Sequence, residues 1–285
     1  MLLASAGSVG ALALSSAGVA CAAAVNGGTP PAGRLKQSVS RWPYGKIPLP
    51  EFARACKAMG LAGIDLLQPD DWAVVRDAGL VPTMGYPAKR DDFIATGFND
   101  RANHAMLLRE LEATIPLAAR EGVPNVITMF GNRKGRTDDE GIANCVEGLK
   151  KIAPLAEEQN VTVCVELLNS KVDHKDYQGD STAFGAAVVR GVGSPRVKLL
   201  YDIYHMQIME GDVIRTVREH LAEIGHFHTG GVPGRHEIDD TQELNYHAVA
   251  RAIADAGFTG YIAHEFVPTR DLLASLRQGV EICTV

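Results

Sequence analysis

Short runs of aliphatic and β-branched residues alternate along the chain with longer segments in which apolar residues recur every three or four positions. The first pattern predicts buried strands and the second predicts amphipathic helices. The eight expected strands are Leu35–Ser40, Gly63–Leu67, Val81–Gly85, Asn125–Phe130, Val161–Leu167, Val197–Ile203, Ile224–Thr229 and Gly260–Phe266. The clearest helices between them are Asn103–Glu121, Asp139–Gln159, Val213–Glu223 and Tyr246–Ala256. This alternation predicts an α/β fold, a single (β/α)8 TIM barrel with closed parallel strands.

Four ionisable residues stand at the carboxyl ends of the last four predicted strands. They are Glu166, Asp202, His228 and Glu265, separated by roughly 25 to 40 residues, the length of one strand–helix unit. Barrel enzymes build their active sites at this end of the strands, so we expect these side chains to converge within about 5 Å of a common point. Carboxylates with one imidazole predict a single divalent ion, Mn²⁺ or Mg²⁺ with Co²⁺ as a further option, rather than structural zinc.

Five further polar residues come after these strands and are candidates for substrate contact. His205, in the loop after the sixth strand, could bind a substrate hydroxyl, orient the preceding aspartate or be satisfied by the backbone. Arg235 and His236 come after a Gly-Gly-Val-Pro-Gly turn, and the arginine suits either a substrate carboxylate or a surface ion pair. Lys171 and His174, in the loop after the fifth strand, could close over a substrate or remain solvated.

The net charge and the cysteine spacing limit the kinds of molecule that the protein is expected to bind. The chain has 285 residues and a net charge of −6, which disfavours nucleic acid and anionic membranes as partners. Its five cysteines have neither the pairing of a disulfide scaffold nor zinc-finger spacing. We therefore expect a small-molecule substrate, such as a sugar or hydroxy-keto acid, no nucleic acid and no stable membrane span. Homo-oligomerisation stays open.

The first 33 residues differ from the rest of the chain in composition. Residues 1–33 carry no charged side chain, and residues 1–24 end in small residues that would suit signal cleavage. A basic segment is missing, and the opening resembles the stretch directly after the arginine pair of a twin-arginine signal, which predicts a truncated start. We expect a signal-like segment at 1–24, a linker at 25–34 and the barrel at 35–285. The protein would then be exported, to the periplasm, or cytoplasmic if the signal is not used.

With these residues in view, the chain resembles the xylose-isomerase-like barrels, and within them the hydroxypyruvate isomerase group. The resemblance covers nearly all of the chain after the linker. The resemblance implies one divalent metal ion on the four strand-end residues, with Glu166 and Glu265 also acting as acid and base. Hydroxypyruvate isomerases usually have Gln in place of His228, which indicates a divergent branch. The most specific motifs are Asp202-Ile-Tyr-His-Met-Gln207, Gly231-Val-Pro-Gly-Arg-His-Glu237, Glu243-Leu-Asn-Tyr246 and His264-Glu-Phe266.

The resemblance implies an isomerase that moves a carbonyl through an enediolate, converting hydroxypyruvate to tartronate semialdehyde. Such a reaction requires proton removal beside a carbonyl, with a cation to stabilise the resulting negative charge. A ketose 3-epimerase or an inosose-dehydratase-like lyase would use the same residues. Related abasic-site endonucleases need three zinc ions and a basic cleft, which the acidic balance disfavours. A non-catalytic exported sugar-binding barrel is the remaining alternative, and it gives no chemical reason to keep both glutamates.

Overall fold

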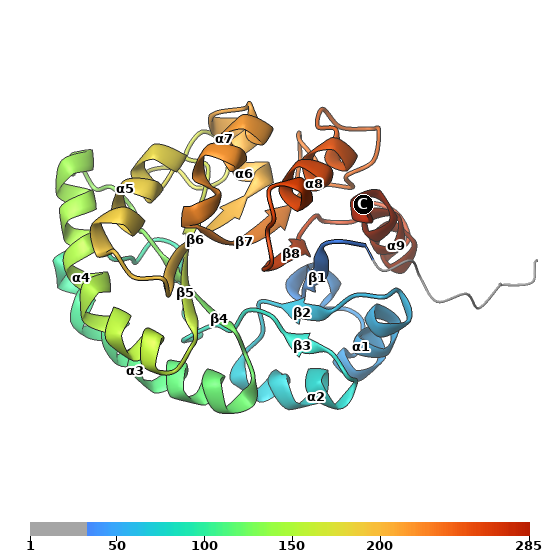
Figure 1. The fold of residues 1–285 in the computed structure, drawn as a ribbon, viewed down its shortest axis with the longest axis horizontal. Coiled ribbons are helices and arrows are strands. Elements are labelled where there is room, and N and C mark those ends of the chain that lie inside the picture. Colours follow the sequence, from blue (N-terminus) through green and yellow to red (C-terminus); the bar gives the residue numbers. More distant parts are fainter. Residues whose placement is uncertain (1–32) are drawn as a thin grey trace, which may run out of the picture.

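The computed structural model describes residues 33–285 and shows eight parallel strands surrounded by helices (Figure 1). The predicted TIM barrel is therefore confirmed. The strands are β1 (Lys36–Ser40), β2 (Gly63–Asp65), β3 (Val81–Pro82), β4 (Asn125–Met129), β5 (Thr162–Leu167), β6 (Val197–Asp202), β7 (Ile224–Thr229) and β8 (Tyr261–His264). The α-helices are α1 (Leu49–Ala58), α2 (Trp72–Asp77), α3 (Arg101–Glu121), α4 (Asp138–Glu158), α5 (Thr182–Val192), α6 (Ile203–Met209), α7 (Val213–His220), α8 (Tyr246–Asp255) and α9 (Leu272–Cys283). Short 3-10 helices occupy Trp42–Tyr44, Pro69–Asp71 and Leu221–Glu223.

A single glycine closes the barrel between β3 and β4. The continuous sheet runs in the order β3-β2-β1-β8-β7-β6-β5-β4, and the two outer strands meet through Gly85. Its N–H donates to the Asn125 carbonyl at 2.9 Å, and its carbonyl accepts from the Ile127 N–H at 3.1 Å. A side chain at this position would begin 2.6 Å from the Trp72 ring, so glycine allows the close approach. Strand β3 is shorter than predicted, although the Thr83 N–H beyond it still donates to the Ile64 carbonyl at 2.8 Å.

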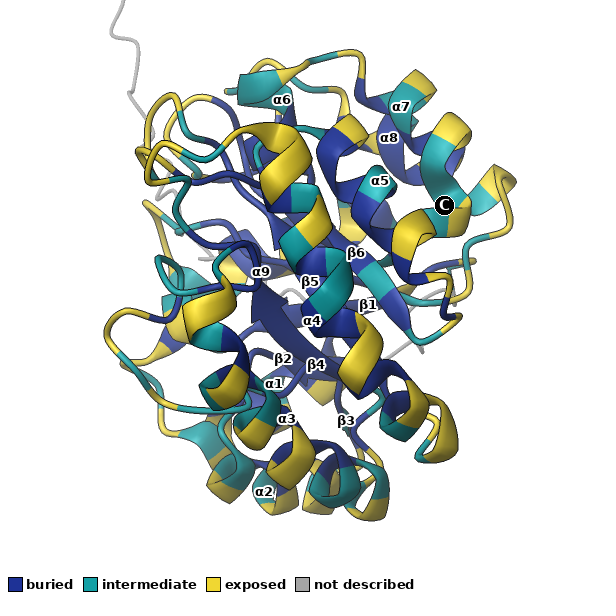
Figure 2. Cartoon of the chain, turned by 90° about the vertical axis from the view of Figure 1, so that its left-hand side faces the viewer, coloured by how far each residue is buried: buried dark blue, intermediate teal, exposed yellow. Residues whose placement is uncertain are grey.

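The helices around the barrel begin and end at residues suited to those positions. The Asp100 carboxylate accepts from the Ala102 N–H at the start of α3, and Gly122 ends that helix with a φ of 72°. Thr137 and Glu140 form a reciprocal capping box at the start of α4. The longer helices, such as α3 and α4, bury their inner faces and expose their outer ones (Figure 2). The apolar core therefore lies between the helices and the strands and leaves the strand ends free for polar residues.

The sequence-based placement of His205 in a loop is wrong. His205 lies in α6, which begins directly after Asp202. The Asp202 carboxylate accepts a hydrogen bond from the His205 N–H at 3.2 Å and so caps this helix. Residues 203–206 are buried on all sides, which removes the amphipathic pattern that normally reveals a helix. Asp202 therefore ends a strand and begins a helix, which fixes its backbone on both sides.

A register shift between β6 and β7 places two site residues side by side. Leu199 pairs with Ile224, but the next residue, Leu200, pairs with His226, so one residue of β7 is passed over. Asp202 consequently pairs with His228, and both side chains lie on the same face of the sheet. Without the shift, Asp202 would lie opposite Phe227, which belongs to the core.

The predicted export segment at 1–24 and nearly all of the predicted linker at 25–34 lie outside the described residues. Among the helices of residues 33–285, none has the length and apolar character needed to cross a membrane.

Candidate functional site

The four residues expected to bind a metal ion converge at the carboxyl end of the barrel. Glu166 lies near the end of β5, Asp202 ends β6, His228 lies near the end of β7, and Glu265 comes directly after β8. One ligand atom from each lies within 4.8 Å of the ligand atoms of the other three, and all four side chains are buried. The convergence results from their equivalent positions on four neighbouring strands. That these residues hold an ion stays a prediction.

The environment of His228 fits a metal ligand. Its Nδ1 atom is buried and has no hydrogen-bond partner of suitable geometry. The same atom lies 3.4 Å from Glu166 Oε1 and 3.9 Å from Asp202 Oδ2, and it contacts Glu265 Oε2. Three buried carboxylates repel one another unless cations compensate their charge, and the Arg235 guanidinium reaches two of them, Asp202 and Glu265, but not Glu166. The donor set of three carboxylates and one imidazole therefore suits a divalent cation.

The two glutamates differ in their electrostatic surroundings. Burial raises the pKa of Glu166 to about 7, and the neighbouring Glu265 and Asp202 carboxylates add to this increase while His228 opposes it. Burial alone would also raise the pKa of Glu265, but His228 and Arg235 bring it below its ordinary value. Burial opposes the charged form of His228, yet Glu265 and the other carboxylates hold its pKa well above the ordinary value. The structure thus contains two nearby carboxyl groups with pKa values shifted in opposite directions.

Arg235 lies inside the site rather than on the surface. Its Nη2 atom donates to Asp202 Oδ2 at 2.7 Å and to Glu265 Oε2 at 2.6 Å, and its guanidinium lies 4.8 Å from the centre of the Tyr204 ring. The other oxygen of Glu265, Oε1, accepts from Trp42 Nε1 at 2.6 Å. Both oxygens of Glu265 are therefore oriented, one by a cation and one by an indole N–H.

The buried ring of His205 is surrounded by hydrogen-bond donors. The Asn169 backbone N–H donates to His205 Nδ1 at 3.2 Å, so this nitrogen must be the acceptor. The other ring nitrogen, Nε2, lies 2.7 Å from Arg235 Nη1, which can only donate, and 3.7 Å from Asp202 Oδ2, so both ring nitrogens face N–H donors. Burial and the nearby Arg235 cation keep the pKa of His205 well below its usual value. His205 thus stays neutral.

A cavity of about 600 Å³ opens above the four candidate ligands. Glu166, Glu265, Arg235, His205 and His174 line it. The other two predicted substrate contacts lie outside its lining: Lys171 Nζ donates to the Ile208 and Met209 carbonyls at 3.0 and 2.9 Å, and the exposed His236 pairs with the Val267 carbonyl.

The cavity also contains residues that sequence reasoning missed. Trp42 comes two residues after the end of β1, which is the same kind of position that identified the predicted ligands. Tyr86 and Phe93 belong to the long connection between β3 and α3, and they supply an apolar wall opposite the charged floor. The rule that strand ends carry site residues would have found Trp42, whereas the connection from 83 to 100 offers no periodic pattern.

Comparison with known proteins agrees with this geometry. The sequence model of one family, described as the xylose isomerase-like TIM barrel, matches residues 13–283. A human protein provisionally named a hydroxypyruvate isomerase is 26% identical over 240 residues, covering 82% of this chain and 80% of the human protein. A 2-oxo-tetronate isomerase from Cupriavidus necator is 37% identical over 134 residues, which is 47% of this chain and 51% of that enzyme. Both of these relatives are named as isomerases.

Solved structures show the same fold. An AP endonuclease of family 2 from Brucella melitensis has a TM-score of 0.75 and 21% identity, covering 85% of this chain and 97% of its own. A D-psicose 3-epimerase solved in the presence of D-fructose has a TM-score of 0.65 and 18% identity, covering 87% and 96%. At these identities the likeness concerns the fold alone. Because the family model extends over nearly the whole barrel, the chain belongs to the xylose isomerase-like TIM barrel family.

Proposed function

We propose that the protein is a metal-dependent isomerase that moves a carbonyl along a short hydroxy-keto acid or sugar through an enediolate, with hydroxypyruvate as the preferred substrate. One observation carries the proposal. Glu166 and Glu265 both line the cavity, while Asp202 and His228 lie buried beside them with their ligand atoms within the same cluster. This arrangement offers two carboxylates to a substrate and keeps all four residues close enough for one ion.

Glu166, Asp202, His228 and Glu265 would hold the metal ion, and three oxygen donors with one imidazole favour Mn²⁺ or Mg²⁺, with Co²⁺ also suitable. When bound, the ion polarises a substrate carbonyl and stabilises negative charge on the adjacent oxygens.

The protein side chains supply the proton transfer. A carboxylate facing the cavity removes the proton from the carbon beside the carbonyl, and a carboxyl group returns a proton to the neighbouring carbon. Trp42 and Arg235 hold Glu265 in one orientation, so its carboxylate is already positioned for proton transfer when the substrate binds. His205 lines the same cavity, and its Nε2 lies 2.7 Å from Arg235 Nη1, so it helps to position that guanidinium beside the substrate. Arg235 supplies the positive charge that a substrate carboxylate requires.

A ketose 3-epimerase is the second candidate, and the size of the cavity favours it. A volume of about 600 Å³ exceeds what a three-carbon acid needs and would accept a six-carbon sugar. The chemistry is unchanged in its first step, because epimerisation also begins with proton removal beside a carbonyl. An inosose-dehydratase-like lyase would share that step and then expel water.

A substrate panel separates these reactions. Hydroxypyruvate, ketoses and inososes are each assayed with the metal-stripped protein and after addition of Mn²⁺. The proposal expects Mn²⁺-dependent conversion of hydroxypyruvate, with deuterium from heavy water entering the carbon beside the carbonyl. Conversion limited to ketoses supports the epimerase. Product without solvent deuterium contradicts the enediolate route, and metal binding without turnover of any compound supports a sugar-binding barrel instead.

A further inference from the structure

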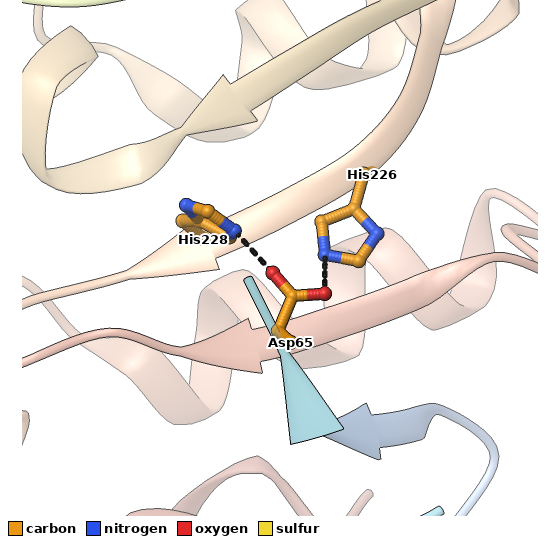
Figure 3. A group of neighbouring side chains, drawn as sticks. All are labelled: Asp65, His226 and His228. Carbon is orange, nitrogen blue, oxygen red and sulfur yellow. Dashed lines mark hydrogen bonds and ion pairs between the residues drawn. The ribbon is translucent and has the colours of Figure 1, made fainter. Parts of the chain in front are cut away.

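A second buried cluster lies directly behind the candidate metal site. It consists of Asp65 on β2 and of His226 and His228 on β7 (Figure 3). Asp65 Oδ2 lies 2.8 Å from His228 Nε2, and Asp65 Oδ1 lies 3.2 Å from His226 Nε2. All three side chains are fully buried. Two strands, β1 and β8, separate β2 from β7 in the sheet, so this contact crosses the interior of the barrel.

The two ring nitrogens of His228 point to different partners. Nδ1 faces Glu166, Asp202 and Glu265, whereas Nε2 faces Asp65. A histidine binds a metal ion through a nitrogen that carries no hydrogen, so binding through Nδ1 requires the hydrogen to lie on Nε2. The Asp65 carboxylate accepts that hydrogen and so selects the tautomer that leaves Nδ1 free.

Asp65 is itself held in place by neighbouring strands. The Thr83 hydroxyl, just after β3, donates to Asp65 Oδ1 at 2.6 Å, the same oxygen that His226 approaches. Both carboxylate oxygens are therefore engaged, and the plane of the carboxylate is fixed. A fully buried carboxylate is costly to retain, and an apolar residue of similar volume would serve packing equally well. The residue is better explained by its effect on His228 than by stability.

We propose that Asp65 is a positioning residue for the metal centre: it binds His228 Nε2–H and thereby orients Nδ1 toward the ion held by the strand-end carboxylates. This inference rests on the proposed metal site. Asp65 touches neither the substrate cavity nor the candidate carboxylate ligands, so it acts only through His228. The carboxylate also makes the imidazole a stronger donor, as hydrogen-bonded ligands are in other metal sites.

The test measures Mn²⁺ affinity of the chelator-stripped protein by calorimetric titration, together with its thermal unfolding before metal is added. Asp65→Ala is expected to weaken Mn²⁺ binding by about 10–100-fold, the usual effect of losing such a partner. Asp65→Asn is expected to lose less, because its amide oxygen can still accept from His228 while Thr83 and His226 adjust to the amide N–H₂. Ser38→Ala is the matched control, since Ser38 is equally buried inside the barrel on β1 and its hydroxyl has no partner.

Each outcome bears on one of the two proposals. Asp65→Ala that binds Mn²⁺ within about twofold of the unaltered protein overturns the positioning role, even if its metal-free melting temperature is lower. An unaltered protein that binds neither Mn²⁺, Mg²⁺ nor Co²⁺ overturns the proposed function and this inference with it. If Asp65→Ala does not fold, Asp65→Leu, which fills a similar volume without an acceptor, decides through the nitrogen coupling of bound Mn²⁺ in pulsed electron paramagnetic resonance. A coupling weaker than that of the unaltered protein supports the role, and an unchanged coupling and affinity overturn it.

Discussion

Glu265 has the most constrained side chain of the site, and its replacement tests catalysis separately from folding. Glu265→Gln keeps the shape, but its single amide oxygen can accept from only one of the two donors, Trp42 or Arg235, which bind different oxygens of Glu265. It removes the charge that accepts a proton, so we expect turnover to fall by at least about 10²-fold while some metal affinity is preserved. Steady-state kinetics and Mn²⁺ titration of the same sample measure the two effects. Turnover within a few-fold of the unaltered protein would assign proton transfer elsewhere.

Arg235 tests which class of substrate the cavity accepts. Arg235→Ala is expected to weaken binding of hydroxypyruvate and to affect a neutral ketose little, because only an anion gains a charge-assisted pair. Arg235→Lys is the control that keeps the charge but loses the planar pair of donors, and it should restore part of the affinity. The readout is KM for both substrates. Equal losses for acid and ketose would instead indicate that Arg235 serves mainly to hold Asp202 and Glu265.

The candidate ligands at the strand ends could be predicted from the sequence, but the contact of Asp65 with His228 could not. The four candidate ligands each come after a clear apolar run. Asp65 is followed by Leu66 and Leu67, so the sequence pattern placed it in the middle of a longer strand rather than at its end. An acidic residue inside such a run was itself a signal, because a buried carboxylate requires partners. Those partners, Thr83 and His226, come from distant parts of the chain, and only the folded barrel identifies them.

At the level of elements, one carboxylate joins the loop after β7 to the start of α9. Glu237 is buried and accepts from the Thr269 N–H at 2.9 Å, the Thr269 hydroxyl at 2.9 Å and the Ser275 hydroxyl at 2.8 Å. Burial would raise its pKa, but these hydrogen bonds lower the pKa of Glu237 to about 2. The ionised form therefore stabilises the loop that also carries Arg235.

The lowered pKa of Glu237 predicts that Glu237→Gln reduces the free energy of unfolding by an amount that depends on pH. Since the folded-state pKa lies below the unfolded value of about 4.3, the stabilisation is complete above about pH 5 and is lost as the pH falls toward about 2. We expect a loss of about 1–3 kcal/mol in the free energy of unfolding at pH 7, and a smaller difference in acid. Urea unfolding at several pH values measures it, with the exposed Glu243→Gln of the same loop as control. A difference that does not shrink in acid would contradict the assignment.

Among the secondary-structure elements, the strands could be predicted from the sequence better than the short helices. All eight strands were found because their apolar runs have strand length, but α6 was missed because seven mostly buried residues show no helical face. The register shift after Leu199 could not be predicted either, because nothing in the local sequence marks it. It arises from the pairing of β6 with β7, and it determines that Asp202 meets His228.

For the whole molecule, we propose that residues 1–24 act as an export signal and that the barrel folds without them. Strand β1 pairs with both β2 and β8, so the ring is complete within residues 36–264. A chain starting at Gly33 is expected to unfold at the same temperature as the full chain, whereas one starting at Arg41 should not fold, because it lacks β1. A marked loss of stability on removing 1–32 would contradict this. Fractionation of cells that produce the full chain tests export.

A metal ion shared by β5 to β8 should stabilise the folded barrel as a whole. Mn²⁺ at about 100 times its Kd contributes about 2.7 kcal/mol to a protein that binds it only when folded, which predicts a melting temperature higher by about 5–10 °C. Asp202→Asn is the sharpest variant, because asparagine caps a helix as well as aspartate and so preserves α6, yet it supplies no charge to the ion. We expect its metal-free melting temperature to fall, because the amide N–H₂ replaces the oxygen that accepts from Arg235, and its rise with Mn²⁺ to be less than half as large as that of the unaltered protein. An equal rise in both proteins would place the bound Mn²⁺ outside the cluster at the ends of these four strands.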